Sequence, residues 1–254
     1  MPFTSTKHTS MTQKFFSGML KIILLSFIPM VMVSCNPQLL SPGIKGSGII
    51  VTEERKIDDY SAIDLRLPGN VKVSADDRFQ LQVSADDNII GEIDTFTRNG
   101  TLIISSNKNF RNPTIDIHVS LPSVEKISVS GSGDILVGDV FPCEEMYFRV
   151  RGSGSITTKV DAEVIHSTIA GSGSVNLSGE AYLQNIQIAG SGSLNGYDLN
   201  TLVSRVTVNG SGNSYISVEE HLEVKNNGSG NVYFRGNPQK NLVMRGSGKV
   251  YNTD

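Results

Sequence analysis

Little in this 254-residue sequence points to a helical or catalytic protein. It has no tryptophan, and only two cysteines, Cys35 and Cys143, which excludes a disulfide framework and a cysteine-based zinc cluster. The formal net charge of −3, without a basic cluster, argues against nucleic acid as a partner. No phosphate-binding loop, nucleophile elbow or histidine-rich metal motif is present, so we expect no cofactor, no bound metal and no enzyme.

What the sequence does have is a recurring Gly-Ser-Gly tripeptide. After an early copy at Gly46–Gly48, the tripeptide recurs with nearly even spacing, centred on Ser132, Ser153, Ser172, Ser191, Ser211, Ser229 and Ser247. This period of about 20 residues is too short for a domain and is typical of a solenoid. One coil alone buries too little apolar surface to offset its backbone entropy, so coils must stack. The sequence therefore predicts an all-β fold, a parallel β-helix or closely related β-solenoid with Gly-Ser-Gly corners.

The register of the repeats predicts which side chains face inward. Positions three and five residues before each central serine, and three after it, are mostly apolar, as Val150 and Ile156 are around Ser153. The odd offsets therefore face the core, which also places both glycines inside and the serine outside. We expect glycine there because an inward side chain would crowd the corner and because glycine accepts a positive φ. Seven identical serines are expected to serve the backbone rather than catalysis.

The N-terminus is typical of an exported protein. The apolar run Ile22–Val33 is too short to span a bilayer but suits the core of a signal peptide. The Met-Val-Ser-Cys sequence that ends at Cys35 resembles the lipobox of bacterial lipoproteins. We therefore predict a lipoprotein signal peptide over residues 1–34, starting at Met1 or Met11, and a lipidated Cys35 that attaches the chain to a membrane. An ordinary secretory signal with a coincidental cysteine is the alternative.

Beyond Cys35 we expect two further parts. Residues 35–45, which contain Pro37, Ser41, Pro42 and Gly43 and show no periodicity, are predicted to form a tether. Residues 46–254 are predicted to form a single elongated β-solenoid, with divergent N-terminal coils over 46–125 and the Gly-Ser-Gly repeats over 126–254. Short alternating runs separated by turn residues support strands in the first of these parts. The only helical turn expected there lies within Asp87–Ile93, with Asp87 as its N-cap.

An outward cluster near the C-terminus is the candidate binding site. Four residues after the central serine, the last three repeats carry Tyr215, Tyr233 and Tyr251, and neighbouring outward positions hold Asn213 and Asn231. Stacked coils would align the rings as a ladder bordered by amides. Such a strip can receive sugar rings and hydroxyls, or a protein surface. The alternative is that the tyrosines stack on one another only to stabilise the coils.

Other chemically interesting residues have simpler explanations. Three Asp-Asp pairs, which begin at Asp58, Asp76 and Asp86, could hold calcium or perform acid-base chemistry. All three lie at expected strand ends, where aspartate is common in turns and caps. Cys143 beside Pro142 could be a reactive thiol, but we expect a partly buried thiol at a strand end. A bridge from Cys35 to Cys143 remains open only if the lipobox interpretation is wrong.

Several segments together resemble the head-GIN domain, an auto-transporter adhesin family found in Bacteroidetes lipoproteins. The resemblance covers about residues 46–254, and it rests on the order of the following segments: Gly46–Gly48, Thr52–Arg55, Asp59–Ile63, Val83–Asn88, Gly100–Ile104, Val119–Pro122 and Ser130–Gly133. It implies a β-helical fold and a cell-envelope location, and it supplies no catalytic residues.

We therefore expect a lipid-anchored envelope protein that acts by binding, in an adhesin-like way, to a glycan or an envelope protein, either as a monomer or as an oligomer. We expect the anchor in the outer membrane. The residues after Cys35 lack the acidic run expected of surface-exported lipoproteins, which favours the periplasmic side. One alternative is a polysaccharide-active β-helix enzyme, which needs two carboxylates and a basic residue in one outward groove. The other is a structural scaffold of the envelope.

Overall fold

The computed structural model describes Met1 and residues 43–254. The predicted signal peptide, the lipidation of Cys35 and most of the tether lie outside these residues. Gly43–Asp254 forms one compact unit. Its regular structure consists of strands and one short 3₁₀ turn, η2 (Ile90–Glu92). No helix among the described residues is long and apolar enough to cross a membrane.

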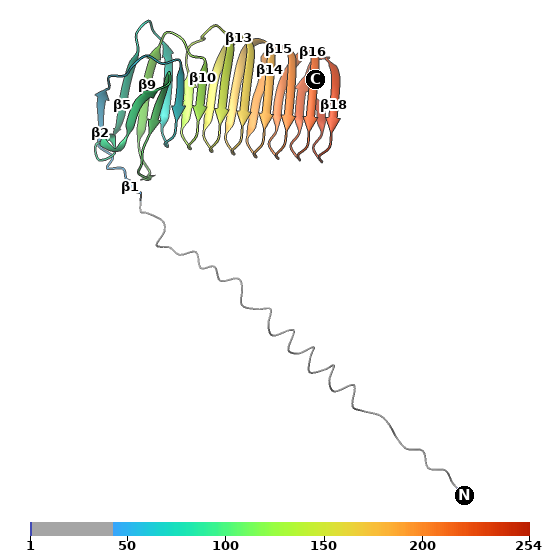
Figure 1. Cartoon of the computed structure of the whole chain (residues 1–254), viewed down its shortest axis with the longest axis horizontal. Coiled ribbons are helices and arrows are strands. Elements are labelled where there is room, and N and C mark those ends of the chain that lie inside the picture. The colour runs from blue at the N-terminus through green and yellow to red at the C-terminus, as the bar shows by residue number, and fades with distance from the viewer. Residues whose placement is uncertain (2–42) are drawn as a thin grey trace. The chain divides into compact units, whose positions relative to one another are not determined.

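The second half of the chain is a parallel β-solenoid, as the repeat predicts. Each strand pairs in parallel with the equivalent strand of the next coil, and Figure 1 shows the coils side by side from β10 to β18. The strands are β10 (Lys126–Val129), β11 (Asp134–Val137), β12 (Cys143–Val150), β13 (Ser155–Ile169), β14 (Ser174–Ile188), β15 (Ser193–Val208), β16 (Ser214–Asn226), β17 (Val232–Arg235), β18 (Gln239–Met244) and β19 (Val250–Asn252).

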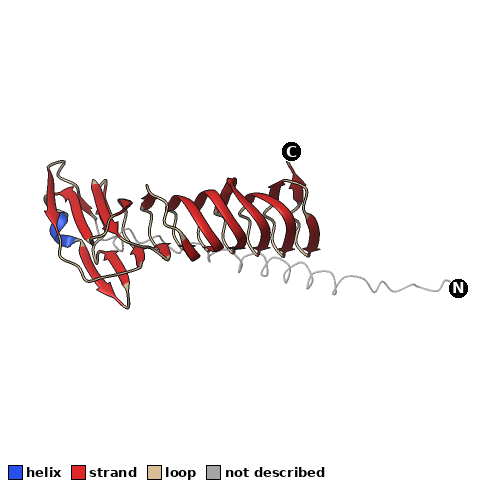
Figure 2. Cartoon of the chain, turned by 90° about the horizontal axis from the view of Figure 1, so that it is seen from above, coloured by secondary structure: helices blue, strands red, loops and turns tan. Residues whose placement is uncertain are grey.

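Every coil has two faces, which Figure 2 shows as a zigzag of strands seen from above. Face A leads into the Gly-Ser-Gly corner and consists of β10, β12, β18 and the second halves of β13 to β16. Face B follows the corner and consists of β11, β17, β19 and the first halves of β13 to β16. The long strands bend from face B onto face A, so one strand supplies most of a coil.

The predicted inward and outward positions are confirmed. Three residues before the central serine, the column from Val129 to Asn226 is fully buried in six successive coils. The central serines are all exposed, whereas the second glycine of each corner is buried. The core is therefore a set of apolar columns that run along the solenoid, closed at one edge by a glycine column.

The glycine corners are explained by the coil next to them rather than by φ. None of the glycines in the seven corners has a positive φ, so that part of our expectation is wrong. Instead, a Cβ built on Gly173 would lie closer than 3.0 Å to the carbonyl oxygen of Gly154, which is the equivalent glycine one coil earlier. The same clash recurs at both glycines of every corner from Gly152 onward. A side chain is excluded because adjacent coils lie only about 4.8 Å apart.

The first part of the unit departs from the expected coils. Its strands are β1 (Ile44–Lys45), β2 (Ile50–Glu54), β3 (Ala62–Leu65), β4 (Asn70–Ala75), β5 (Gln80–Asp86), β6 (Asp94–Arg98), β7 (Thr101–Ser105), β8 (Phe110–Arg111) and β9 (Ile115–Leu121). β3 and β4 continue the parallel stack onto β10 and β11. However, β2, β5 and β9 pair antiparallel, and so do β6 and β7. β7 and β9 also pair in parallel with β3 and β4, so the parallel stack runs through these four strands. The departure from the expected coils lies in β2, β5 and β6, whose partners are all antiparallel.

A tight turn explains one of the antiparallel pairs. β6 and β7 are joined by Asn99 and Gly100 alone, whose φ values are 49° and 68°. Two successive residues with positive φ form the turn that suits a two-residue hairpin, and asparagine followed by glycine is the preferred sequence for it. The chain therefore reverses onto its neighbour instead of continuing around a coil.

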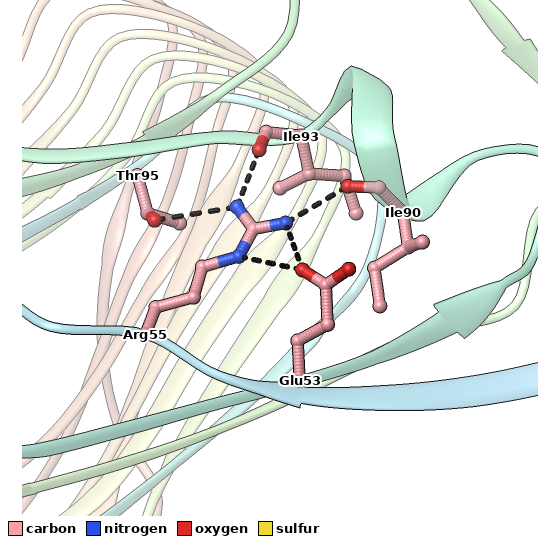
Figure 3. A network of polar contacts seen from close by, with 5 residues as sticks. All are labelled: Glu53, Arg55, Ile90, Ile93 and Thr95. Atoms are coloured by element: carbon pink, nitrogen blue, oxygen red, sulfur yellow. Dashed lines mark hydrogen bonds and ion pairs between the residues drawn. The ribbon is translucent and has the colours of Figure 1, made fainter.

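The end of the solenoid at this part is covered by η2. The turn buries Ile89, Ile90 and Ile93 against the core. The guanidinium of Arg55 donates to the carbonyl oxygens of Ile90 and Ile93 and pairs with Glu53, as Figure 3 shows. This network holds the turn over the apolar columns. A helical turn was predicted here, but its N-cap is Ile89 and not Asp87.

Asp86 and Asp87 instead hold the start of the compact unit. Asp86 is buried, and its carboxylate accepts hydrogen bonds from the backbone N–H of Gly48 and of Thr114, both at 2.7 Å. The Asp87 carboxylate accepts from the Ser47 hydroxyl at 2.5 Å. The two backbone hydrogen bonds hold the pKa of Asp86 below its ordinary value. The early Gly-Ser-Gly copy is therefore a segment that Asp86 and Asp87 fix by hydrogen bonds, and not a coil corner.

Candidate functional site

An outward column on face B carries the predicted tyrosines. The residues four positions after the central serine pair in register from coil to coil, so their side chains form one line along the solenoid. In chain order this column contains Thr157, Asn176, Asn195, Tyr215, Tyr233 and Tyr251. The prediction named the last three, and the structure brings all six together.

The tyrosines stack face to face. The ring centroids of Tyr215 and Tyr233 are 5.0 Å apart with an interplanar angle of 7°, and those of Tyr233 and Tyr251 are 5.2 Å apart at 15°. The inner faces of these rings are therefore covered by one another, which is the stabilising arrangement we considered as the alternative. The stack offers a ligand its ring edges and its hydroxyl groups.

Asn213 and Asn231 lie beside the tyrosines but bind the backbone. The side-chain oxygen of Asn213 accepts from the N–H of Asn231 at 2.8 Å, and that of Asn231 accepts from the N–H of Lys249 at 2.9 Å. The amide nitrogen of Asn231 also donates to the Tyr233 hydroxyl at 3.2 Å. Each oxygen thus satisfies a backbone donor of the following coil, and its capacity for a ligand is reduced accordingly.

The earlier half of the column is a polar ladder. The amide nitrogen of Asn195 donates to the side-chain oxygen of Asn176 at 2.7 Å, and the amide nitrogen of Asn176 donates to the Thr157 hydroxyl at 3.0 Å. An amide nitrogen carries two hydrogens, and each ladder bond uses only one of them. The ladder therefore aligns a row of donors along face B.

A bulge turns this part of face B into a groove. Between Gly196 and Asn200 the pairing of β15 with β16 shifts, which leaves three extra residues, Tyr197, Asp198 and Leu199, on β15. Such a bulge redirects side chains out of the regular ladder. Tyr197 and Asp198 form one wall of an open groove of about 540 Å³. The other lining residues are Val137, Thr157, Thr158, Lys159, Asn176, Leu177, Ser178, Asn195 and Tyr215.

Tyr197 is held firmly in this wall. Its ring meets Tyr215 edge-on at 5.6 Å and 68°. The guanidinium carbon of Arg235 lies 4.2 Å from the Tyr197 ring centroid, a cation–π contact. The Tyr197 hydroxyl also lies 3.1 Å from that of Thr253. The groove thus has a preformed aromatic wall beside its amide ladder.

The sequence held signals for the groove residues that the prediction did not use. Thr157, Asn176 and Asn195 occupy the same offset as the predicted tyrosines and could have been read from the register. The interval from Ser191 to Ser211 is longer than the two intervals before it, which marks the coil that contains the bulge. Nothing in the spacing indicates that Tyr197 would be the residue displaced toward Tyr215.

The remaining candidates do not form a catalytic site. Asp76 accepts from the Arg78 N–H in a local turn, as expected of a turn aspartate. Asp161, Glu180 and Glu219 line an open groove of about 450 Å³, but no basic residue lines it with them. Among the described residues, no group of three histidine, cysteine or acidic side chains could hold a metal ion.

Cys143 is a free, half-buried thiol at the first position of β12. Burial raises its pKa, and the nearby carboxylates of Glu125 and Asp161 raise the pKa further. A raised pKa keeps the sulfur protonated and poorly nucleophilic. The structure thus agrees with the expected partly buried thiol at a strand end.

Comparison with known proteins agrees with this architecture. The model of a family described as "Putative auto-transporter adhesin, head GIN domain" matches residues 59–238, well over half of the chain. The chain belongs to this family. The resemblance of the sequence to the head GIN domain is therefore confirmed, while no curated protein matches the chain.

Solved structures show the same fold. A "putative adhesin" from Bacteroides fragilis is 23% identical, with a TM-score of 0.79, and the match covers 83% of this chain and 100% of that one. A "putative lipid binding protein" from Parabacteroides distasonis is 20% identical, with a TM-score of 0.66 and coverage of 83% and 99%. A "putative adhesin" from Parabacteroides merdae is 16% identical, with a TM-score of 0.68 and the same coverage.

Proposed function

We propose that this head GIN protein is a non-enzymatic binding protein of the cell envelope that takes a glycan in the face B groove. The observation that carries the proposal is the groove itself, where the amides of Asn176 and Asn195 stand beside the rings of Tyr197 and Tyr215. The names of the related structures, two adhesins and a lipid-binding protein, agree with a binding role.

The chemistry of the groove suits a saccharide. Sugar rings combine apolar C–H faces with hydroxyls that both donate and accept hydrogen bonds. Leu177 and Val137 supply apolar surface, while Thr157, Ser178 and the two asparagines supply hydroxyls and amides. Lys159 and Asp198 place one charge of each sign at the groove, so no net charge selects a strongly acidic or basic ligand.

The proposed location rests on the N-terminal sequence. A lipidated Cys35 would hold the protein on the outer membrane, facing the periplasm, with the solenoid as the part that meets the ligand. Replacing Cys35 with alanine would then release the protein from the membrane fraction of cells. Protease treatment of whole cells would distinguish a periplasmic from a surface position.

A glycan array with the Gly43–Asp254 unit tests the ligand. For the best glycan we expect Tyr197→Ala and Asn176→Ala to weaken binding about tenfold, since each removes a principal contact. Tyr182→Ala is the matched control, because Tyr182 is a tyrosine of the same solenoid that is 57% exposed and lies outside this groove.

Thermal unfolding of each variant must first show an intact fold. The proposal fails if no glycan binds, or if Tyr182→Ala weakens binding as much as Tyr197→Ala does. An enzyme would instead release a shortened product from the bound glycan, which chromatography of the incubated ligand would detect.

A further inference from the structure

Face A carries a second groove whose lining is cationic and aromatic. The groove measures about 320 Å³ and is lined by Lys126, Tyr147, Phe148, Arg149, His166 and Thr168. Lys126, Tyr147 and His166 pair in register and form one outward column across three coils. Arg149 and Thr168 belong to the next outward column, two residues further along each strand. Neighbouring strands therefore place one lysine, one arginine and one histidine around a single hollow.

The lysine and the arginine of this groove are not neutralised within the protein. Neither Lys126 nor Arg149 has a carboxylate oxygen within 4.0 Å among the residues that the structure describes. Arg149 is nevertheless half-buried, so part of its side chain lies against the protein rather than in solvent. An arginine without a carboxylate partner is the kind of residue that binds an oxyanion.

The acid that contacts the two rings of this groove, Glu145, is already engaged. The Tyr147 hydroxyl donates to the Glu145 carboxylate, and the His166 Nε2 atom lies 3.9 Å from the same carboxylate. The Tyr147 and His166 rings stack with centroids 4.6 Å apart and an interplanar angle of 7°. Glu145 therefore orients the two rings and leaves the charges of Lys126 and Arg149 for a ligand.

Another cation on face A is paired within the protein, in contrast to Arg149. Lys225 occupies the same outward column as Arg149, four coils further along. The Lys225 amine is 2.8 Å from the Glu223 carboxylate, which also lies 3.7 Å from Arg205. Lys225 and Arg205 are thus paired within the protein, whereas Arg149 is not.

From this geometry we infer that face A holds a binding site for a phosphate monoester, with Arg149 and Lys126 as its charged ligands and Thr168 as a neutral donor. Strand spacing places the Arg149 backbone about 8 Å from those of both Lys126 and His166, which is within reach of one tetrahedral anion for these long side chains. Phosphate offers oxygens in several directions to donors from different strands, whereas a carboxylate offers two oxygens in one plane.

The site is distinct from the groove proposed for a glycan. That groove lies on face B after the glycine corner, and this one lies on face A before it. Loss of phosphate binding should therefore leave glycan binding unchanged, and the reverse. The two proposals can fail independently.

The test uses the Gly43–Asp254 unit with inorganic phosphate as the probe. Titration followed by the backbone amide resonances of Tyr147, Arg149, His166 and Thr168 should give saturable shifts. Arg149→Gln should weaken phosphate binding about tenfold, the usual effect of losing a charge-assisted contact. Lys225→Gln, the matched control from the same column, should bind as the parent does.

A second arm distinguishes a free phosphate from one carried by lipid. Sedimentation with phosphatidylcholine vesicles, with and without phosphatidic acid, tests the same variants. Binding only to the phosphatidic acid vesicles, lost in Arg149→Gln and kept in Lys225→Gln, would assign the phosphate to a lipid headgroup.

Three results would overturn the inference. The first is the absence of saturable binding in both arms. The second is an equal loss in Arg149→Gln and Lys225→Gln, which would indicate only a diffuse positive field. The third is an equal response to acetate at matched ionic strength, which would show that phosphate is not preferred. Unchanged thermal unfolding of both variants makes these comparisons valid.

Discussion

The two ends of the described unit close the same apolar columns in different ways. At the first end, η2 lies over the core, and Arg55 fixes this turn by donating hydrogen bonds to its backbone carbonyls. At the last coil no described residue covers the columns: Leu242 is 42% exposed and Met244 39%, whereas their counterparts one coil earlier, Val224 and Asn226, are fully buried. One end is capped by structure, and the other is left as an open strand edge.

The open edge carries its own protection. Lys240 pairs with Leu222 and so occupies an inward column that is apolar or neutral from Met146 to Leu222. An inward-pointing charge on an edge strand discourages another strand from adding to it. A solenoid can therefore end in two ways. A short segment can cover the core, or an inward charge on the last strand can make the addition of another strand unfavourable.

The Gly-Ser-Gly corners of the coils and the tight turn between β6 and β7 also require glycine for different reasons. Coil corners need glycine because of a neighbouring carbonyl, whereas the turn at Asn99 and Gly100 needs residues that tolerate positive φ. A glycine therefore has a different physical meaning in each part. Four experiments test these differences between the two ends and between the two kinds of glycine.

Gly173→Ala should be the most damaging change. Its Cβ would clash with the Gly154 carbonyl and with the Val150 side chain, both parts of the packed preceding coil. We expect a loss of about 3 kcal/mol in the free energy of unfolding, measured with urea. Gly91→Ala is the control, because nothing lies within 4 Å of its Cβ, and it should be neutral. Equal effects would refute the glycine ladder.

Arg55→Gln should lower the free energy of unfolding by a smaller amount, about 2 kcal/mol, because it leaves the carbonyls of Ile90 and Ile93 without a charged donor. Hydrogen exchange should accelerate selectively in η2 and not in the coils. The control is Arg78→Gln. The Arg78 side chain is 79% exposed, so its replacement should change the free energy of unfolding little. Uniform acceleration through the solenoid would show that the cap and the coils are not separable.

Asp86 should make the start of the unit sensitive to acid. Its pKa lies below the ordinary value of 3.8, so its stabilising contribution is complete above about pH 3.8 and is lost as pH falls through the lower folded value. Asp86→Asn should therefore lower stability at neutral pH and weaken the acid dependence. Unfolding free energies measured from pH 7 to pH 2 would show this, and an unchanged acid dependence would contradict it.

Lys240→Leu should change association more than stability. The inward side of β18 would then be apolar at position 240 as well as at Leu242 and Met244, and copies should associate as concentration rises, as measured by light scattering after size-exclusion chromatography. Lys249→Leu, on the outward side of the same coil, is the control. If neither variant associates more than the parent protein does, the inward lysine is not what protects the edge.

The regular part of the fold could be predicted because its determinants are local. Side chains alternate across a strand, so the parity that buries Val150 and exposes Ser153 follows from counting residues. Equal repeat lengths then align equivalent residues of successive coils, which is why Tyr215, Tyr233 and Tyr251 could be predicted to stack.

Other features depend on neighbours that are distant in sequence. The need for glycine at position 173 comes from the Gly154 carbonyl of the preceding coil, brought close by the stack and not by the φ of Gly173 itself. The antiparallel strands depend on which partner each edge finds, and the groove depends on a bulge that shifts Tyr197 toward Tyr215. Parity and period are properties of the chain, whereas contact between coils exists only once the chain has folded.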